Sequence, residues 1–349
     1  MIAETIDKIK PLDTTAMTIC EKRWDNIAKP LKSLGKIEEN IIQIAGIQRD
    51  SRVKISKKAL VVMCADNGVV EEGVTQTGQE VTAIVAENFL DEKSCAAIMC
   101  KDTKTDIFPV DIGMVVDTKR VEKRKIAYGT KNIYKEPAMT REEAIKAIWT
   151  GIELAGELKE KGYQIIATGE MGIGNTTTSS AVCSALTGMD AAVVTGRGAG
   201  LTSKGLERKI EVIQSAIDKW KPDCEDPIDV LSKVGGFDLA GLTGIYLGAA
   251  ANGIAVVMDG FISAAAALCA VKLCGLVSDY ILASHMSKEP ASELLMKLLN
   301  KEPSLNCNMC LGEGTGALLL MPMLEMGLHI YETMSTFEEI DVETYVPLV

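Results

Sequence analysis

Aromatic residues and histidines are scarce in this chain of 349 residues. Phe, Trp and Tyr together account for 4% of it, and His285 and His329 are its only histidines. A catalytic triad built on histidine therefore has few ways to form, and neither histidine lies in a Gly-x-Ser-x-Gly or comparable nucleophile context. No group of potential ligands has the spacing of a metal site. We expect no histidine-based nucleophilic enzyme, no metal and no other cofactor.

The chain also lacks an excess of positive charge, and its N-terminus does not resemble a secretory signal peptide. The chain has 37 Lys and Arg residues against 48 Asp and Glu, a formal net charge of -11, whereas nucleic acids and anionic membranes bind clustered positive charge. Residues 254–277 are apolar, but Asp259 and Lys272 interrupt them, which favours a buried strand followed by an Ala-rich helix over a membrane span. The first eight residues contain no apolar h-region. We expect a cytoplasmic protein with no nucleic-acid or membrane partner.

Small and aliphatic residues are plentiful where aromatics are not. Apolar residues make up 47% of the chain, and the abundance of Ala, Gly, Val, Ile, Leu and Met suits helices packed tightly on a parallel sheet. The ten cysteines are scattered through apolar stretches, as buried reduced thiols are. Cys307 and Cys310 form the only C-x-x-C pair, for which we expect packing rather than a metal or redox role. The predicted class is α/β.

Helical and strand-like segments divide the chain into two predicted regions. At 349 residues the chain exceeds the usual size of one core. Residues 51–320 are predicted to form a large α/β catalytic domain, and residues 1–50 with 321–349, which lack strand signals, a small helical domain. Helical patterns cover residues 15–27 and 34–48, and short apolar runs predict strands at 59–65, 105–110, 164–168, 191–195, 254–258 and 280–283.

Acidic residues follow several of the predicted strands. Asp66, Asp111, Glu170 and Asp259 each lie at or just beyond the C-terminal end of one. Doubly wound sheets bind their ligands at that edge. These four positions are therefore the first candidates for chemistry.

Two glycine-rich loops are candidates for phosphate binding. Residues 167–180 follow a strand and open a helix, whose free amides and Asn and Thr side chains suit a phosphate. The segment is neither a Walker A loop nor a complete G-x-G-x-x-G, and an N-capped structural helix fits its spacing equally well. Residues 195–201 precede Arg208 and Lys209, cations that suit a phosphate monoester. Taken alone, this second loop is more simply a tight turn.

Glu313 is the sharpest single candidate for catalysis. Glycines flank it within residues 311–316, and the apolar run 317–321 follows. Small neighbours let a substrate ring approach, and an apolar wall raises the pKa of a carboxyl group, which makes it a better base near neutral pH. A helix-start carboxylate that complements the helix dipole fits the same pattern, and the local pattern alone favours that structural interpretation.

Taken together, these loops resemble those of the nicotinate-nucleotide:dimethylbenzimidazole phosphoribosyltransferases, which make the lower-ligand nucleotide of cobamides. The resemblance runs nearly end to end. It implies a Rossmann-like parallel sheet flanked by helices, with a small helical domain built from both termini, in a homodimer. The ordered matches are Lys29-Pro30 with Ser33-Leu34-Gly35-Lys36-Ile37-Glu38, then Cys64-Ala65-Asp66-Asn67-Gly68-Val69, residues 169–177, Gly196-Arg197-Gly198, residues 233–241, Met258-Asp259-Gly260-Phe261 and residues 311–317.

The resemblance implies transfer of the 5-phosphoribosyl group from nicotinate mononucleotide to 5,6-dimethylbenzimidazole or a related base, in assembly of the cobalamin nucleotide loop. The products are nicotinate and α-ribazole 5'-phosphate, with inversion at the anomeric carbon. By position, Glu313 is the base that removes the azole N–H proton, and Glu170 assists it. The other implied residues are Gly172, Asn175, Thr176, Gly198 and Lys209 for the phosphate, Asp259 and Ser287 for the ribose and nicotinate side, and Thr77, Val85, Met171 and Leu311 for the base pocket.

The chain departs from the commonest family pattern at Lys32, Asn67 and the pair Thr77-Gly78. That pair lies within residues 74–85, which line the base pocket in the family, so the accepting base stays open. A phenolic acceptor, used by two-subunit relatives, is the alternative within the same enzyme class. A dinucleotide-dependent oxidoreductase would need a complete G-x-G-x-x-G early in the chain. The retained acids argue against a non-catalytic binding relative.

Overall fold

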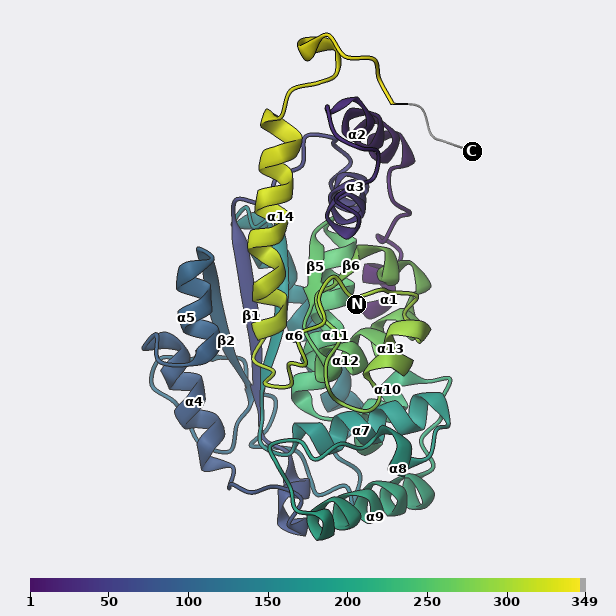
Figure 1. Cartoon of the computed structure of the whole chain (residues 1–349). Coiled ribbons are helices and arrows are strands. Elements are labelled where there is room, and N and C mark those ends of the chain that lie inside the picture. The colour runs from purple at the N-terminus through teal and green to yellow at the C-terminus, as the bar shows by residue number, and fades with distance from the viewer. Residues whose placement is uncertain (346–349) are drawn as a thin grey trace.

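The centre of the molecule is one parallel sheet of six strands, in the order β3-β2-β1-β4-β5-β6. The computed structural model describes residues 1–345, and Figure 1 traces their course through the fold. The α/β class and the Rossmann-like parallel sheet expected from the sequence are confirmed. The strands are β1 (Lys58–Ala65), β2 (Thr105–Gly113), β3 (Glu122–Lys123), β4 (Ile165–Met171), β5 (Ala255–Met258) and β6 (Ile281–Ala283).

Strand β1 illustrates why the sheet forms where it does. All of its residues are buried, and its run of aliphatic side chains is typical of a parallel strand that is covered on both faces. It pairs with β2 on one side and β4 on the other, so that Lys58 is aligned with both Thr105 and Ile165. The chain adds β2 and β3 before it crosses back to β4. The strand order therefore reverses between β1 and β4, where doubly wound sheets open a crevice for ligands.

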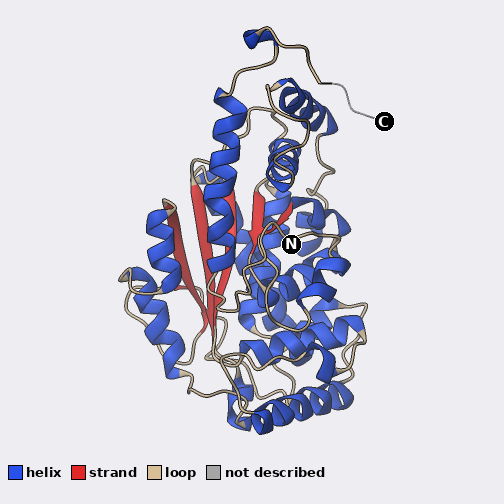
Figure 2. Ribbon diagram, in the orientation of Figure 1, coloured by secondary structure: helices blue, strands red, loops and turns tan. Residues whose placement is uncertain are grey.

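Helices cover both faces of the sheet (Figure 2, helices blue). Helices α4 (Glu80–Leu90), α5 (Cys95–Asp102) and α14 (Thr315–Thr333) pack on one face, and α11 (Phe237–Ala251) and α12 (Phe261–Leu273) pack on the other. Helix α6 (Arg141–Glu160) runs along α11. The remaining helices are α1 (Ile2–Ile6), α2 (Thr14–Asn26), α3 (Lys36–Gln48), α7 (Asn175–Thr187), α8 (Ala191–Val194), α9 (Ser203–Trp220), α10 (Pro227–Val234) and α13 (Ser292–Leu298), with short 3-10 turns at Gly68–Glu72, Gly275–Tyr280 and Glu338–Ile340.

Helices α2 and α3 lie beside the far end of α14, whereas α1 packs on α11 and α6 (Figure 1). The ring of Trp24, on α2, lies 5.0 Å from the ring of Tyr331, and Arg23 Nε donates to the Tyr331 carbonyl oxygen at 2.9 Å. The predicted domain boundary before residue 321 falls inside α14, whose first turns pack on the sheet. Residues 346–349 of the predicted tail lie outside the described chain. The division into two domains stays a prediction.

Most of the predicted helices and strands are found, and one predicted strand is a helix instead. Residues 191–195 were expected as a strand, but Ala191–Val194 form helix α8, which Asp190 caps by accepting a hydrogen bond from the amide of Ala192 at 2.7 Å. An apolar run this short carries no period that separates strand from helix. The other five predicted strands and both N-terminal helices are confirmed, as is the strand and helix pair expected over residues 254–277. Strand β3 has two exposed charged residues and no sequence signal.

The cysteine prediction is wrong for several residues. All ten thiols are free, but Cys95, Cys224, Cys307 and Cys310 are exposed rather than packed in the core. Charged residues flank Cys224 and asparagines flank Cys307, a local signal of exposure that the treatment of all ten cysteines as one group overlooked. Within residues 1–345, no helix combines the length and the apolar character needed to cross a membrane.

The contact between α6 and α11 depends on glycine, which gives a test of the packing. A methyl group at Gly151 would overlap the carbonyl oxygen of Gly241. We therefore expect Gly151→Ala to lower the free energy of unfolding by about 1–3 kcal/mol, the usual cost of overpacking. A methyl group at Gly156, on the same helix, would meet only Asn252 Nδ2, at an ordinary contact distance of 4.0 Å. Gly156→Ala should leave stability unchanged or raise it by about 0.5–1 kcal/mol. Urea unfolding measures both, and equal effects would contradict the packing argument.

Candidate active site

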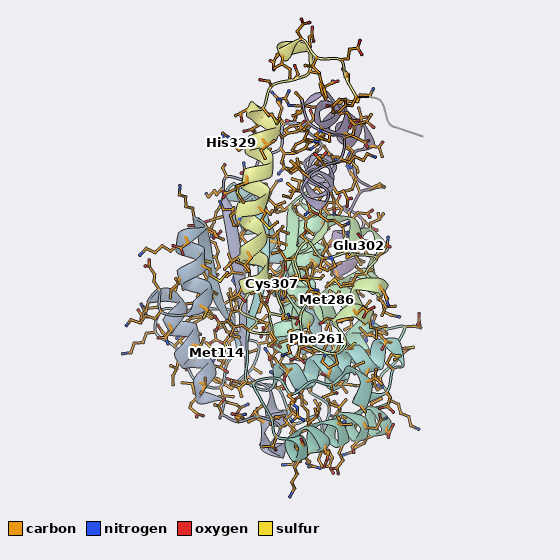
Figure 3. All side chains as sticks on the ribbon, in the orientation of Figure 1. Met114, Phe261, Met286, Glu302, Cys307 and His329 are labelled. Atoms are coloured by element: carbon orange, nitrogen blue, oxygen red, sulfur yellow. The ribbon has the colours of Figure 1, made fainter. Side chains whose placement is uncertain are left out.

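A pocket of about 260 Å³ lies at the C-terminal edge of the sheet, beyond β4, β5 and β6. Figure 3 labels Phe261, which begins α12 and forms part of the pocket wall. It also labels His329, which lies far along α14. His329 is exposed, whereas His285 is buried in the pocket wall. The lining residues are 170–173, Asn175, Thr176, Gly198, Ala199, 259–263, His285, Ser287, Glu289 and 310–313.

One end of the pocket is a cradle around the start of α7. Gly172 packs so closely on the Ala65 carbonyl oxygen that a methyl group there would overlap it. Thr176, in the first turn of α7, accepts a hydrogen bond from Lys209 Nζ at 2.9 Å through its hydroxyl oxygen. Gly198 lies against the same hydroxyl group with a left-handed backbone, φ 51°. Two loops and helix α9 therefore meet at the free amides of the N-terminus of α7, a natural site for an anion.

Lys209 supplies the positive charge of this cradle. Its side chain is 1% exposed, and Nζ also donates to the carbonyl oxygen of Gly196 at 3.1 Å. Burial lowers the pKa of Lys209 to about 8, and the negative charge of Glu289 opposes that shift. The adjacent Arg208 bonds Glu72 and lies over the ring of Tyr134, so it is directed elsewhere. The cradle therefore contains a cation that titrates close to neutral pH.

Two carboxyl groups next to the cradle differ in their surroundings. Glu170, at the end of β4, is buried and accepts a hydrogen bond from the Asn175 side chain. Burial, with the negative charges of Asp238 and Asp259, holds the pKa of Glu170 well above its usual range. Burial also raises the pKa of Glu313, although its Oε2 accepts a hydrogen bond from the amide of Ala96 at 3.3 Å, which opposes the shift.

The loop that carries Glu313 has an unusual backbone. Gly312, Glu313 and Gly314 have φ values of 87°, 60° and 85°, all in the left-handed region. Glutamate rarely adopts that region, and such residues persist only where the surrounding structure holds them. A methyl group at Gly169 would press on the Glu313 carbonyl group, at 2.7 Å. The glycines that singled out Glu313 in the sequence thus allow both the turn and its close approach to β4.

Asp259, at the end of β5, holds this loop in place. Its Oδ2 accepts a hydrogen bond from the amide of Gly314 at 3.1 Å, and Oδ1 accepts from the amides of Gly316 at 2.8 Å and Ala317 at 3.2 Å. Burial raises the pKa of Asp259, while the three amides and the neighbouring His285 oppose that shift. The carboxylate caps α14 directly after Glu313. Local sequence pattern does not indicate this cap, because the partners are more than fifty residues apart.

Most of the site residues predicted from the sequence meet in this pocket. Thr77 and Val85, expected in the base pocket, lie outside it: Thr77 is in an exposed loop and Val85 is on α4, packed against the core. Lys209 lies directly behind Thr176. The roles assigned to all of these site residues stay predictions. Those that line the pocket are Glu170, Met171, Gly172, Asn175, Thr176, Gly198, Asp259, Ser287, Leu311 and Glu313.

Sequence reasoning did not single out three further lining residues. Phe261 and Ile262 begin α12, and the position of Phe261 just beyond a predicted strand end was an available signal. Glu289 follows Ser287 on the loop after β6 and has no flanking pattern that marks it.

The fold and the pocket define an α/β group-transfer enzyme, with a helix N-terminus suited to a phosphorylated ligand and two carboxyl groups beside it. Residues 9–342 match a family model described as phosphoribosyltransferase. A nicotinate-nucleotide–dimethylbenzimidazole phosphoribosyltransferase from Ruminiclostridium cellulolyticum is 50% identical over 347 residues, 99% of each chain. One from Acetivibrio thermocellus is 48% identical over the full length of both chains. The chain belongs to the nicotinate-nucleotide–dimethylbenzimidazole phosphoribosyltransferase family.

The solved structures agree with this assignment. A crystal structure of the nicotinate-nucleotide–dimethylbenzimidazole phosphoribosyltransferase from Thermus thermophilus superimposes with a TM-score of 0.87 at 36% identity. The match covers 95% of this chain and 99% of that one. The sequence-based assignment to the family, and to a phosphoribosyltransferase enzyme, is therefore confirmed.

The cap formed by Asp259 can be tested by an isosteric change. In Asp259→Asn one oxygen becomes an NH₂ group, which cannot accept the hydrogen bonds made to it. We expect the free energy of unfolding to fall by about 1–3 kcal/mol, because buried amides lose their acceptor. Asp13→Asn is the control, since Asp13 caps α2 through the amide of Ala16 and asparagine caps nearly as well as aspartate. Urea unfolding of both variants measures this, and equal losses would contradict a special role for Asp259.

Proposed function

We propose that this enzyme transfers the 5-phosphoribosyl group of nicotinate mononucleotide to a ring nitrogen of 5,6-dimethylbenzimidazole. The observation that carries the proposal is the location of Glu313 in one pocket with the cradle of Thr176, Gly198 and Lys209. The names of the relatives support the choice of substrates. The products are nicotinate and α-ribazole 5'-phosphate, which belong to assembly of the cobalamin nucleotide loop.

The cradle binds the 5'-phosphate in this proposal. The free amides at the start of α7, beside Gly172, Asn175 and Thr176, donate to phosphate oxygens, and Lys209 balances their charge. Asp259 and Ser287 lie on the ribose and nicotinate side, where Asp259 acts through the loop that it caps. The acceptor base lies against the apolar side chains of Met171 and Leu311.

Glu313 is the general base of the transfer. The acceptor nitrogen attacks the anomeric carbon, the bond to the nicotinate ring nitrogen breaks, and its electron pair neutralises the pyridinium. The azole N–H proton passes to Glu313, whose raised pKa makes it a stronger base than an exposed carboxylate. Burial holds the pKa of Glu170 well above its usual range, which favours the protonated form, and in this form Glu170 donates a hydrogen bond inside the pocket.

The oligomeric state, the cellular location and the domain division expected from the sequence belong to the same proposal. We infer a homodimer, a cytoplasmic location and a small helical domain of residues 1–50 with 321–349. Thr77 and Val85 are proposed to contribute to the base pocket, although they lie outside the pocket of the single chain. The large apolar side chain of Ile84, next to Val85 on α4, is exposed, which is consistent with a covered face in a dimer. Analytical ultracentrifugation measures the oligomeric state.

Replacement of the proposed base should remove most of the activity. We expect Glu313→Gln to lower kcat for α-ribazole 5'-phosphate formation by roughly a hundredfold to ten-thousandfold, with little change in KM for nicotinate mononucleotide. Chromatography with mass detection of the product measures turnover. Glu332→Gln, an exposed position on α14, is the control and should retain full activity. Normal turnover in Glu313→Gln would remove the mechanism.

The acceptor is tested separately with a panel of benzimidazoles and phenols. Dimethylbenzimidazole should give the highest kcat/KM. A preference for phenols would instead assign the chain to the two-subunit type of relative, with Glu313 removing the phenolic proton.

The pKa of Lys209 predicts a pH dependence of substrate binding. Below about pH 8 the side chain is protonated and attracts the phosphate, which remains a dianion well above its own pKa near 6. The affinity for nicotinate mononucleotide should therefore fall as pH rises from 7.5 to 9.5, by at most about tenfold per unit. Calorimetry at several pH values measures it. Lys209→Met should abolish the dependence, and Lys288→Met, an exposed neighbour of the pocket, should keep it. A pH-independent affinity of the unmodified enzyme would contradict this role.

A further inference from the structure

Glu289 differs from the other acids of the pocket in what it bonds. Four carboxyl groups line the cavity, and three of them accept hydrogen bonds from the protein: Glu170 from Asn175, Glu313 from Ala96, and Asp259 from the start of α14. No residue in the described part of the chain donates a hydrogen bond to the Glu289 carboxylate or forms an ion pair with it. Glu289 is therefore the acid of the pocket whose two carboxylate oxygens are both available to a ligand.

The loop after β6 fixes the position of Glu289. Its amide donates to Ser287 Oγ at 3.4 Å, and the preceding amide, of Lys288, donates to the Met309 carbonyl oxygen at 2.9 Å. Pro290 follows and restricts the backbone further. The carboxylate packs on Gly196, where a methyl group would overlap Oε2. Glu289 is thus held against the loop that also accepts the hydrogen bond of Lys209.

This location places a negative charge at the phosphate end of the pocket. Lys209 and Glu289 attract one another and each moderates the effect of burial on the pKa of the other. A carboxylate beside a phosphate dianion would nevertheless weaken its binding, because like charges repel. Such a group is therefore expected only where it makes a favourable contact with another part of the same ligand.

We propose that Glu289 accepts a hydrogen bond from a ribose hydroxyl of the phosphoribosyl donor and so selects ribose over deoxyribose. The proposal rests on the proposed function, in which a 5-phosphoribosyl group occupies this pocket. The 2'- and 3'-hydroxyls of that group are good donors close to its 5'-phosphate, and carboxylates bind ribose hydroxyls in other nucleotide sites. A phosphate contact and a hydroxyl contact together fix the sugar at two points and orient its anomeric carbon.

Calorimetry with small ligands separates this contact from the binding of phosphate. Ribose 5-phosphate, its 2-deoxy and 3-deoxy analogues and inorganic phosphate are titrated into the enzyme at pH 6.5, below the pKa of about 8 to which burial lowers Lys209. Glu289→Ala should weaken the binding of ribose 5-phosphate by roughly 10- to 100-fold, the range for a hydrogen bond to a charged group. It should leave the affinity for inorganic phosphate unchanged or raise it, because a like charge is removed. At least one deoxy analogue should bind the unmodified enzyme and the variant equally.

Two further variants complete the design. Glu289→Gln keeps an oxygen acceptor and should lose less affinity than Glu289→Ala, and its retained phosphate binding reports an intact pocket. Glu293→Gln is the matched control, because Glu293 is exposed on α13 and pairs with Lys297. Ribose 5-phosphate should bind it as it binds the unmodified enzyme.

Several results would overturn the proposal. Equal losses for ribose 5-phosphate and inorganic phosphate would mean that Glu289 acts only through the charge of Lys209. No loss in Glu289→Ala, or no advantage of ribose 5-phosphate over inorganic phosphate in the unmodified enzyme, would exclude a hydroxyl contact. These titrations need no turnover, so failure of the proposed transfer reaction would be seen separately, in the product assay.

Discussion

Asp259 lies just beyond the end of β5, and its carboxylate accepts hydrogen bonds from three amides at the start of α14. The donors are Gly314, Gly316 and Ala317. These amides form the positive end of the helix dipole, and a buried acceptor satisfies donors that water does not reach. The same contact supports the left-handed backbone of Glu313, one residue earlier. The orientation of the proposed base therefore depends on a hydrogen-bonded link between the sheet and the helix that covers it.

Glu170 and Glu313, two acids of the same type, differ in their burial. Glu170 is enclosed next to two other acids, which holds its pKa well above the usual range. Glu313 is partly open to the pocket, and the amide of Ala96 at the start of α5 moderates the rise in its pKa. Pairs of groups whose surroundings separate their pKa values commonly take opposite roles in proton transfer. The arrangement suits one acid that keeps its proton and another that accepts one.

The sequence was sufficient for features that reside in local pattern. Buried parallel strands are continuous aliphatic runs, so β1, β2, β4, β5 and β6 were predicted, whereas the four residues of α8 were too few to show a period. Glu313 was marked by its flanking glycines. The cap made by Asp259 and the location of Glu289 were not predictable, because both depend on segments far apart in the chain. The family resemblance supplied the roles that pattern alone left open.

The loop after β6 joins the ribose end of the pocket to the proposed base. It runs parallel to the segment before Glu313, where the amide of Met286 donates to the Leu305 carbonyl oxygen at 2.8 Å and the amide of Lys288 to that of Met309 at 2.9 Å. Two backbone hydrogen bonds therefore connect the loop that carries Glu289 to the segment that leads into the Glu313 loop. Because both contacts join backbone to backbone, they hold the proposed ribose contact and the proposed base in one frame, which is what in-line transfer at the anomeric carbon requires.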